Sequence, residues 1–478
     1  MIVLRSAVLS FIFAVLALLP SGCQALPSAN QAATLSPATA AMPAIAPSAA
    51  APTLLPTATD SAGFPTPNST PLSTLAPTST PFNTLTGTLP PCGQILPIIS
   101  DYDGDLIESL DPDPQDLARL QEMLPAAAQP ALDRILNAPA TVGLAAYRAG
   151  QEDRGVYLNP EAPMPLASVV KVIHLVAYAE AVAAGDLDPT STVFLDELQA
   201  FYLPNIDLGA HSRALSDLED NGRVFGDPPA VLLDEVPRMM IARSSNAATD
   251  YLHLLLGQTR VEETAVALGL TSQTAPCPFL GQFLTMANHA LPNNNGYQAW
   301  EQYVADPHSF GRDAMFLTEN FSGDPEFRQT AVDWRRRTRQ PSGQTQRLFS
   351  KDFNAQGSAA DYAALMARIA QNGLSNGESS FIARRFLEWP MRFADNQALF
   401  SNLGYKNGSL PGILTTVYYA YPKGETAPIV VALFFRDLEG RTSRELRDNL
   451  AQDELARWLL YEPEAIPALR AVLSVPSP

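Results

Sequence analysis

Ser168 and Lys171 have the residue types and the spacing for nucleophilic catalysis. They stand three residues apart in an apolar stretch, 166–176, whose pattern continues to Ala184 and ends at Gly185. On a helix, residues at i and i+3 share one face. A serine hydroxyl attacks only beside a base, and a lysine in an apolar wall can have its pKa lowered enough to be that base. A capping serine with a solvent-facing lysine is the plain alternative for Ser-x-x-Lys.

Ser244, Ser245 and Asn246 interrupt a second helical pattern. Residues 234–243 precede them and residues 247–256 follow, and both segments have the apolar spacing of a helix. A hydroxyl at such a corner can pass a proton to a leaving nitrogen, and a carboxamide can hold a substrate amide. A simple N-cap corner is the alternative for Ser-Ser-Asn by itself.

Lys406 and Gly408 belong to a third candidate motif, Lys-Asn-Gly-Ser, which precedes two predicted strands at 414–421 and 429–435. A glycine in an edge strand lets a substrate backbone approach closely, and a lysine beside it offers a positive charge to a substrate carboxylate. A hairpin turn with a solvated lysine is the alternative.

The elements that must position these residues are of mixed type. Helical spacing is found at 115–124, 126–137 and, last, 443–460. Residues 141–148 and 156–159 can form a hairpin around a turn-like segment. We therefore expect a sheet built from this early hairpin and the late strands, with helices on both faces. A helical subdomain would carry Ser168, Lys171 and Ser-Ser-Asn, and the site would lie between the two parts.

The three motifs occur in the order Ser-x-x-Lys, Ser-x-Asn, Lys-x-Gly, which is the motif set of the penicillin-recognising serine enzymes. Over residues 113–462 the chain resembles class A β-lactamases and related low-molecular-weight D,D-peptidases. The segments PLASVVK and ARSSNAATDYLHLLLG add to this resemblance. It implies an α/β (α+β) fold of β-lactamase/transpeptidase type. Such a fold has an antiparallel five-stranded sheet flanked by helices and an all-helical subdomain.

The resemblance also implies roles for individual residues. Ser168 corresponds to the acylated nucleophile, Lys171 to its base or proton relay, and Ser244 to the proton shuttle. The backbone N–H groups of Ser168 and Ser409 correspond to the oxyanion hole. The implied substrate-binding residues are Asn246, Lys406, Asn407, Gly408 and Ser409.

The chain departs from the family pattern at three places. Asn407 replaces the usual Thr, and Ser245 replaces the usual Asp. Class A β-lactamases also carry a Glu some thirty-odd residues after Ser-x-Asn, which activates the deacylating water. The corresponding segment here, 271–296, contains no acid and runs into an enlarged insert, 280–356. The nearest candidates are Glu301, Asp306, Asp313 and Glu319.

Three functions are consistent with these motifs. The first is an exported serine hydrolase of class A β-lactamase type, which forms an acyl-enzyme on Ser168 and hydrolyses β-lactam rings. The second is a cell-wall D,D-peptidase or an esterase with slow deacylation, because the usual Glu is not found. The third is a tethered penicillin- or peptidoglycan-binding protein without turnover. The expected partner is a β-lactam or a peptidoglycan peptide.

The N-terminal hundred residues predict export and anchoring. Residues 1–23 combine a short charged start, an apolar run and Ser-Gly-Cys, which together read as a signal peptide with a lipoprotein cleavage site at Cys23. An ordinary secretory signal cut near Ala25 is the alternative. Residues 24–100 are rich in Pro, Ala, Ser and Thr and read as a disordered tether. We expect a protein of the cell envelope that is lipid-anchored to the outer face of a membrane, or secreted.

The rest of the chain divides into an acidic lead-in at 101–116, a catalytic domain at 113–465 and a C-terminal tail at 466–478. The net charge of −18 excludes nucleic acid as the main partner. Of three cysteines, Cys92 and Cys277 could pair in an oxidising compartment. The five histidines lack ligand spacing, so neither a metal nor another cofactor is expected. We expect a monomer.

Overall fold

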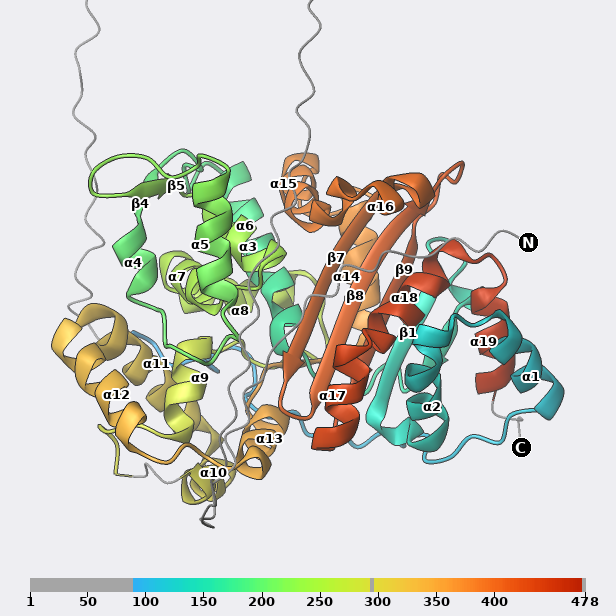
Figure 1. Ribbon diagram of the computed structural model, residues 1–478, viewed down its shortest axis with the longest axis horizontal. Coiled ribbons are helices and arrows are strands. Elements are labelled where there is room, and N and C mark those ends of the chain that lie inside the picture. Colours follow the sequence, from blue (N-terminus) through green and yellow to red (C-terminus); the bar gives the residue numbers. More distant parts are fainter. Residues whose placement is uncertain (1–88, 293–295, 475–478) are drawn as a thin grey trace, which may run out of the picture. The chain divides into compact units, whose positions relative to one another are not determined.

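Figure 1 shows the computed structural model, which describes residues 89–292 and 296–474. The predicted signal peptide, Cys23 and most of the predicted tether lie outside these residues. Within the described ranges, no helix combines the length and the apolar character that crossing a membrane requires.

The central sheet has five antiparallel strands in the order β2-β1-β9-β8-β7. The early hairpin supplies β1 (Val142–Arg148) and β2 (Val156–Leu158), and the late strands are β7 (Phe400–Leu410), β8 (Ile413–Pro422) and β9 (Ile429–Phe435). Strand β7 carries the Lys-Asn-Gly-Ser motif and is an edge strand. The predicted fold class and the predicted joining of early and late strands in one sheet are confirmed.

Both faces of the sheet are covered, because alternate side chains of a strand point to opposite faces. In β9, Val430 and Phe434 pack into a core shared with α14 (Ala359–Ala370) and the helical part. Leu433 packs into the other core, which contains α2 (Gln129–Asn137) and the C-terminal helices. Figure 1 shows α18 (Ala451–Tyr461) and α2 on the near face of the sheet and α14 behind it.

The C-terminal part contains more helices than predicted, and the folded region extends further along the chain. The helix expected over 443–460 is two helices, α17 (Gly440–Asp448) and α18. They are separated at Leu450, whose φ of 52° is left-handed and stops a helix. The predicted tail contains α19 (Ala465–Leu473), which packs on α1 (Pro114–Met123) and β2. Its apolar face is buried in the core, so this segment is part of the fold and not a tail.

The predicted boundary between the N-terminal tether and the folded body was also wrong. Residues 89–100, which we call the N-terminal strap, were predicted as tether, yet they pack on the body and Cys92 forms a disulfide with Cys277. The predicted tether therefore ends before Cys92. The acidic lead-in follows without helix or strand as far as Asp113, which caps α1 by accepting from the backbone N–H of Gln115.

The helical part contains α3 (Lys171–Ala183), α6 (Glu235–Ala242), α7 (Asn246–Leu256) and α8 (Gln258–Ala267). It is not all-helical as predicted, because a small antiparallel pair of strands joins it. This pair consists of β4 (Thr192–Phe194) and β5 (Ala230–Leu232). The remaining helices outside the insert are α4 (Leu195–Gln199), α5 (Ala210–Asp220), α15 (Gly377–Leu387) and α16 (Ala394–Leu399).

The predicted insert, 280–356, forms a layer of helices beside the helical part. It begins within α9 (Phe279–Met286), and α11 (Pro307–Gly323) packs directly on α9. At its end, Gln356–Gly357 (β6) pairs with Met164–Pro165 (β3), just before the Ser-x-x-Lys motif. The insert helices proper are α10 (Gly296–Ala305), α11 (Pro307–Gly323), α12 (Pro325–Arg337) and α13 (Gly343–Asp352).

Candidate active site

Ser168 lies on a short 3₁₀ turn, Ala167–Val170, that leads directly into α3. The residue before it, Ala167, is buried and has a φ of 47°, a backbone conformation that a non-glycine residue adopts only when its surroundings hold it there. The N–H of Ala167 donates to Oδ1 of Asn354 (2.7 Å), and the Thr415 hydroxyl donates to the carbonyl of Leu166 (2.7 Å). Ser168 itself is partly exposed. The turn is thus fixed to β8 while it presents Ser168 outward.

Lys171 is fully buried one turn after Ser168. Its Nζ atom donates to the carbonyl oxygen of Ser244 (2.7 Å) and to Oδ1 of Asn246 (2.8 Å), and it lies 3.2 Å from Oγ of Ser244. Burial, and next the charge of Lys406, lower the pKa of Lys171 well below its usual value. A lysine in this state can act as a base.

The Ser-Ser-Asn corner is held by Ser245. Its Oγ accepts from the N–H of Ala248 (3.1 Å) and so caps α7, and it lies 2.9 Å from Nδ1 of buried His211. Ser244 has a left-handed φ of 62°, and its Oγ lies within hydrogen-bonding distance of Lys171 and Lys406. Ser245, where the family pattern has Asp, therefore has a positioning role at this corner.

Lys406 on β7 completes the polar cluster. It is 2% exposed, and its Nζ donates to Oγ of Ser244 (3.0 Å) and to the carbonyl of Asn407 (2.7 Å). Burial lowers the pKa of Lys406 to about 7, and the carboxylate of Asp453 opposes this shift. The side chain predicted to bind a substrate carboxylate thus loses its charge near neutral pH. Asn407 and Ser409 are exposed on the same strand.

Gly408 brings β7 against Ser168. A Cβ atom at this position would lie 2.5 Å from the backbone nitrogen of Ser168 and 2.5 Å from Oγ1 of Thr415. No side chain fits there without moving one of these groups. The absence of a side chain at Gly408 therefore lets the backbones of Ser168 and β7 lie next to each other. The structure thus brings all three predicted motifs to one place.

Comparison with protein families identifies this arrangement. Residues 127–458, well over half of the chain, match the model described as the beta-lactamase enzyme family. The chain belongs to the beta-lactamase enzyme family. The predicted resemblance to penicillin-recognising serine enzymes is confirmed, and the protein is a serine hydrolase of the superfamily of β-lactamases and penicillin-binding proteins.

Solved structures similar to this beta-lactamase family member are distant in sequence. A β-lactamase from Sphaerobacter thermophilus DSM 20745 is 17% identical, covers 73% of this chain and 98% of its own, and gives a TM-score of 0.41. PBP-A is 14% identical over 74% of this chain and 100% of its own, with a TM-score of 0.39. A β-lactamase from Chitinophaga pinensis DSM 2588 is 14% identical over 71% and 98%, with a TM-score of 0.39. No curated protein matches the chain.

The four acids considered as replacements for the missing Glu of the beta-lactamase family are either exposed or in contact with other groups. Glu301 is exposed on α10, and Asp306 forms an ion pair with Arg312. Asp313 accepts from the Tyr303 hydroxyl (2.8 Å), and Glu319 accepts from the N–H of Leu89 (3.4 Å).

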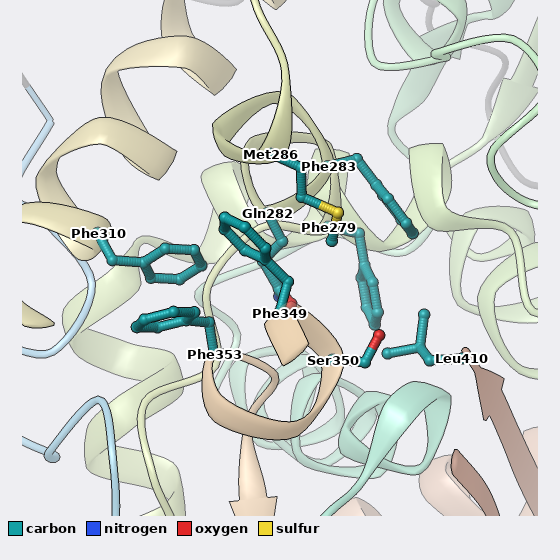
Figure 2. Close-up of a pocket in the computed structure, with 9 residues that line it drawn as sticks. All are labelled: Phe279, Gln282, Phe283, Met286, Phe310, Phe349, Ser350, Phe353 and Leu410. Atoms are coloured by element: carbon teal, nitrogen blue, oxygen red, sulfur yellow. The ribbon is translucent and has the colours of Figure 1, made fainter. Parts of the chain in front are cut away.

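An aromatic ring lies beside the Lys171 amine of this family member. The centre of the Phe279 ring is 4.7 Å from Nζ of Lys171, and Phe279 is 2% exposed. Phe279 also lines an apolar pocket between α9, α11 and α13 (Figure 2). The pocket is lined by Phe279, Gln282, Phe283, Met286, Phe310, Phe349, Ser350, Phe353 and Leu410.

Asp250 holds Phe279 in place and was missed from the sequence. Its buried carboxylate accepts from the N–H groups of Phe279 (2.8 Å) and Leu280 (2.7 Å) at the start of α9. Burial raises the pKa of Asp250 to about 7, although these two N–H groups and the charge of Lys171 lower it. A signal was present in the sequence, because Asp250 is an acid one turn after Asn246 within an apolar helix.

Proposed function

We propose that this member of the beta-lactamase enzyme family forms a covalent ester on Ser168 with β-lactams, and that this ester is hydrolysed slowly. One observation carries the proposal. The buried Lys171 amine, one turn from Ser168, is hydrogen-bonded to both Ser244 and Asn246. The arrangement supplies a base and a proton path for acylation.

Acylation can be written with the residues in this cluster. The Ser168 oxygen attacks the lactam carbonyl, and its proton passes to the neutral Nζ of Lys171. The carbonyl C–N bond then breaks, and the Ser244 hydroxyl gives its proton to the leaving nitrogen. Ser244 recovers a proton from Lys171, whose Nζ lies 3.2 Å from Oγ. The proton of Ser168 thus ends on the nitrogen, and the ring-opened acyl group remains on Ser168.

The oxyanion of this step would be held by the backbone N–H groups of Ser168 and Ser409. The close approach of β7 to the Ser168 nitrogen at Gly408 supports this assignment. Exposed Asn407 and Ser409, with Lys406 beneath them, would bind the carboxylate of a β-lactam or of a peptidoglycan peptide.

Deacylation requires a base that takes a proton from water. The surroundings of Lys171 favour a slow reaction, because the Phe279 ring occupies one side of its Nζ atom. A phenyl ring neither accepts the proton of water nor orders a water molecule for attack. This observation favours slow deacylation over the rapid turnover of a class A β-lactamase.

The experiment is intact-protein mass spectrometry during a stopped assay with a chromogenic cephalosporin, with Ser168→Ala as the control. A single long-lived adduct that is absent from the Ser168→Ala variant would support the proposal. Many turnovers with no accumulated adduct would overturn slow deacylation and favour a β-lactamase. Absence of both an adduct and turnover would overturn acylation by β-lactams.

We also propose that the protein is exported and anchored through a lipid on Cys23. The disulfide between Cys92 and Cys277 supports an oxidising compartment. Mass spectrometry of the N-terminal peptide from membranes would show an acylated Cys23. A peptide that begins near Ala25 would instead indicate a secreted protein.

A further inference from the structure

The N-terminal strap, residues 89–100, is bound to the body through one buried carboxylate. Glu262 on α8 is 0% exposed and accepts from the N–H groups of Gly93 (2.8 Å), Ile95 (2.7 Å) and Leu96 (2.9 Å). The side-chain amide of Gln258 donates a fourth hydrogen bond (2.7 Å). Hydrogen bonds to an ionised acceptor are among the strong ones, so the strap is firmly seated on α8.

The strap is joined to the segment that precedes α9 at two further points. Cys92 forms a disulfide with Cys277, and the N–H of Ala275 donates to the carbonyl of Pro97 (2.7 Å). Both partners on the body side lie between 275 and 277. The strap therefore fixes the chain two residues before Phe279.

The same segment continues into the active site. Asp250 holds the backbone of Phe279 and Leu280, and the Phe279 ring lies against Nζ of Lys171. An unbroken series of contacts thus leads from Glu262 through the strap and Cys277 to the catalytic amine.

We propose that the N-terminal strap is a positioning element for the active site, which holds the Phe279 ring against Lys171 and so sets the lifetime of the acyl-enzyme. The part about lifetime rests on the proposed ester at Ser168. Cys92, Cys277 and Glu262 are the positioning residues. When the strap is released, Phe279 gains freedom to withdraw and water reaches the side of Ser168 that faces Lys171.

The test compares two strap variants with a matched control. The strap variants are Cys92→Ser/Cys277→Ser and Glu262→Gln. The control is Asn159→Asp, which disturbs a similar buried polar hub. There, Asn159 accepts from the N–H of Ile107 (2.8 Å) and donates to the carbonyls of Pro139 and Val142, where β1 begins. This hub lies after β2, at the opposite edge of the sheet from β7. Thermal unfolding of all variants measures the general loss of stability.

Two readouts separate positioning from stability. The decay of the Ser168 adduct in mass spectrometry is expected to be roughly 2- to 30-fold faster in the strap variants, with a smaller effect on acylation. The ¹⁹F resonance of 4-fluorophenylalanine incorporated at position 279 is expected to shift or sharpen in both strap variants. The control is expected to change neither readout, even if its unfolding temperature falls.

Unchanged decay and an unchanged ¹⁹F resonance in folded strap variants would overturn the inference. If wild-type protein forms no adduct, the proposed acylation fails, but the ¹⁹F resonance still decides whether the strap positions Phe279. If Glu262→Gln does not fold, the double cysteine variant and reduction of the wild-type disulfide provide the same comparison.

Discussion

The Nζ atom of Lys171 lies 4.7 Å from the centre of the Phe279 ring. An ammonium group near an aromatic face is attracted to it, although a neutral amine gains little from the same contact. Since burial favours the neutral amine here, the main effect of Phe279 is to exclude water. In the proposed mechanism, the polar groups for acylation surround Lys171, and an apolar ring rather than a base occupies this side of its Nζ atom.

Replacing Phe279 by Glu should speed deacylation. A carboxylate beside Lys171 could take a proton from water, and general-base catalysis contributes about 10²–10⁴-fold. Phe279→Gln is the matched control, because its side chain has the same size as Glu but no basic carboxylate. Decay of the Ser168 adduct in mass spectrometry measures the effect. Equal decay rates in the Glu and Gln variants would show that access of water, rather than a missing base, limits hydrolysis.

Replacing Lys171 by Met should slow acylation by roughly 10²–10⁴-fold, because the base is removed while the apolar stem is kept. Lys171→Arg should not restore the rate, since a guanidinium does not lose its proton in proteins. The second-order rate of adduct formation checks both variants. Wild-type acylation by the Arg variant would mean that Lys171 acts as a cation and not as a base.

The pH dependence of acylation should differ between charged and neutral substrates. Lys406 has a pKa of about 7, so its ammonium group is present below this pH and is lost above it. The second-order rate constant reports groups of the free enzyme. It should therefore fall above about pH 7 for benzylpenicillin, whose carboxylate needs a cation. The methyl ester of benzylpenicillin should show no such fall. A parallel fall for both compounds would contradict the assigned role of Lys406.

Gly408→Ala should impair acylation without unfolding the protein. The added methyl group would lie 2.5 Å from the nitrogen of Ser168 and would displace a proposed oxyanion donor. Loss of one such donor costs about 10²–10³-fold in rate. Gly440→Ala is the control, because a Cβ there meets no atom within 4 Å. Adduct formation together with circular dichroism would reveal the change, and normal acylation by Gly408→Ala would exclude this oxyanion hole.

Leu469→Ala should destabilise the whole domain. Leu469 on α19 is 0% exposed and belongs to the core on the α18 side of the sheet. Removal of a buried leucine side chain costs about 2–5 kcal/mol of unfolding free energy. Ala471→Ser on the exposed face of the same helix should change it by less than about 0.5 kcal/mol. Denaturant titration compares the two, and an equally small effect for Leu469→Ala would mean that α19 adds little to the fold.

The sequence predicts well what depends on local spacing. Ser168 and Lys171 were recognisable because an i, i+3 pair on an apolar helix is a local pattern, and β8 and β9 because continuous apolar runs identify buried strands. Leu450 was not recognised as a helix break, because its left-handed backbone is imposed by the packing of α17 and α18. The helix at Ala465–Leu473 was taken for a tail because its length gave too little periodicity.

Local spacing does not predict the contacts between segments that are far apart in the sequence. The lack of an acid after Ser-x-Asn was visible, but that Phe279 would lie at Lys171 depends on the hydrogen bonds of Asp250 to the start of α9. The strap also differs from the tether in composition, with Leu or Ile at five of its twelve positions, and this difference was overlooked. Glu262 offers its carboxylate to three N–H groups of the strap, and this partner lies too far along the chain for local spacing to indicate it.

The disulfide places the residues of the active site in two covalently different parts of the chain. Cys92 and Cys277, 185 residues apart, close a ring that contains Ser168 and Lys171, whereas Lys406 lies outside it. A protease that cuts the chain between β4 and β5 leaves both pieces joined through sulfur. A cut among the insert helices instead releases the strand that carries Lys406 from every covalent link to the nucleophile. The covalent connection between Ser168 and Lys406 after proteolysis therefore depends on an intact insert and not on the segment between β4 and β5.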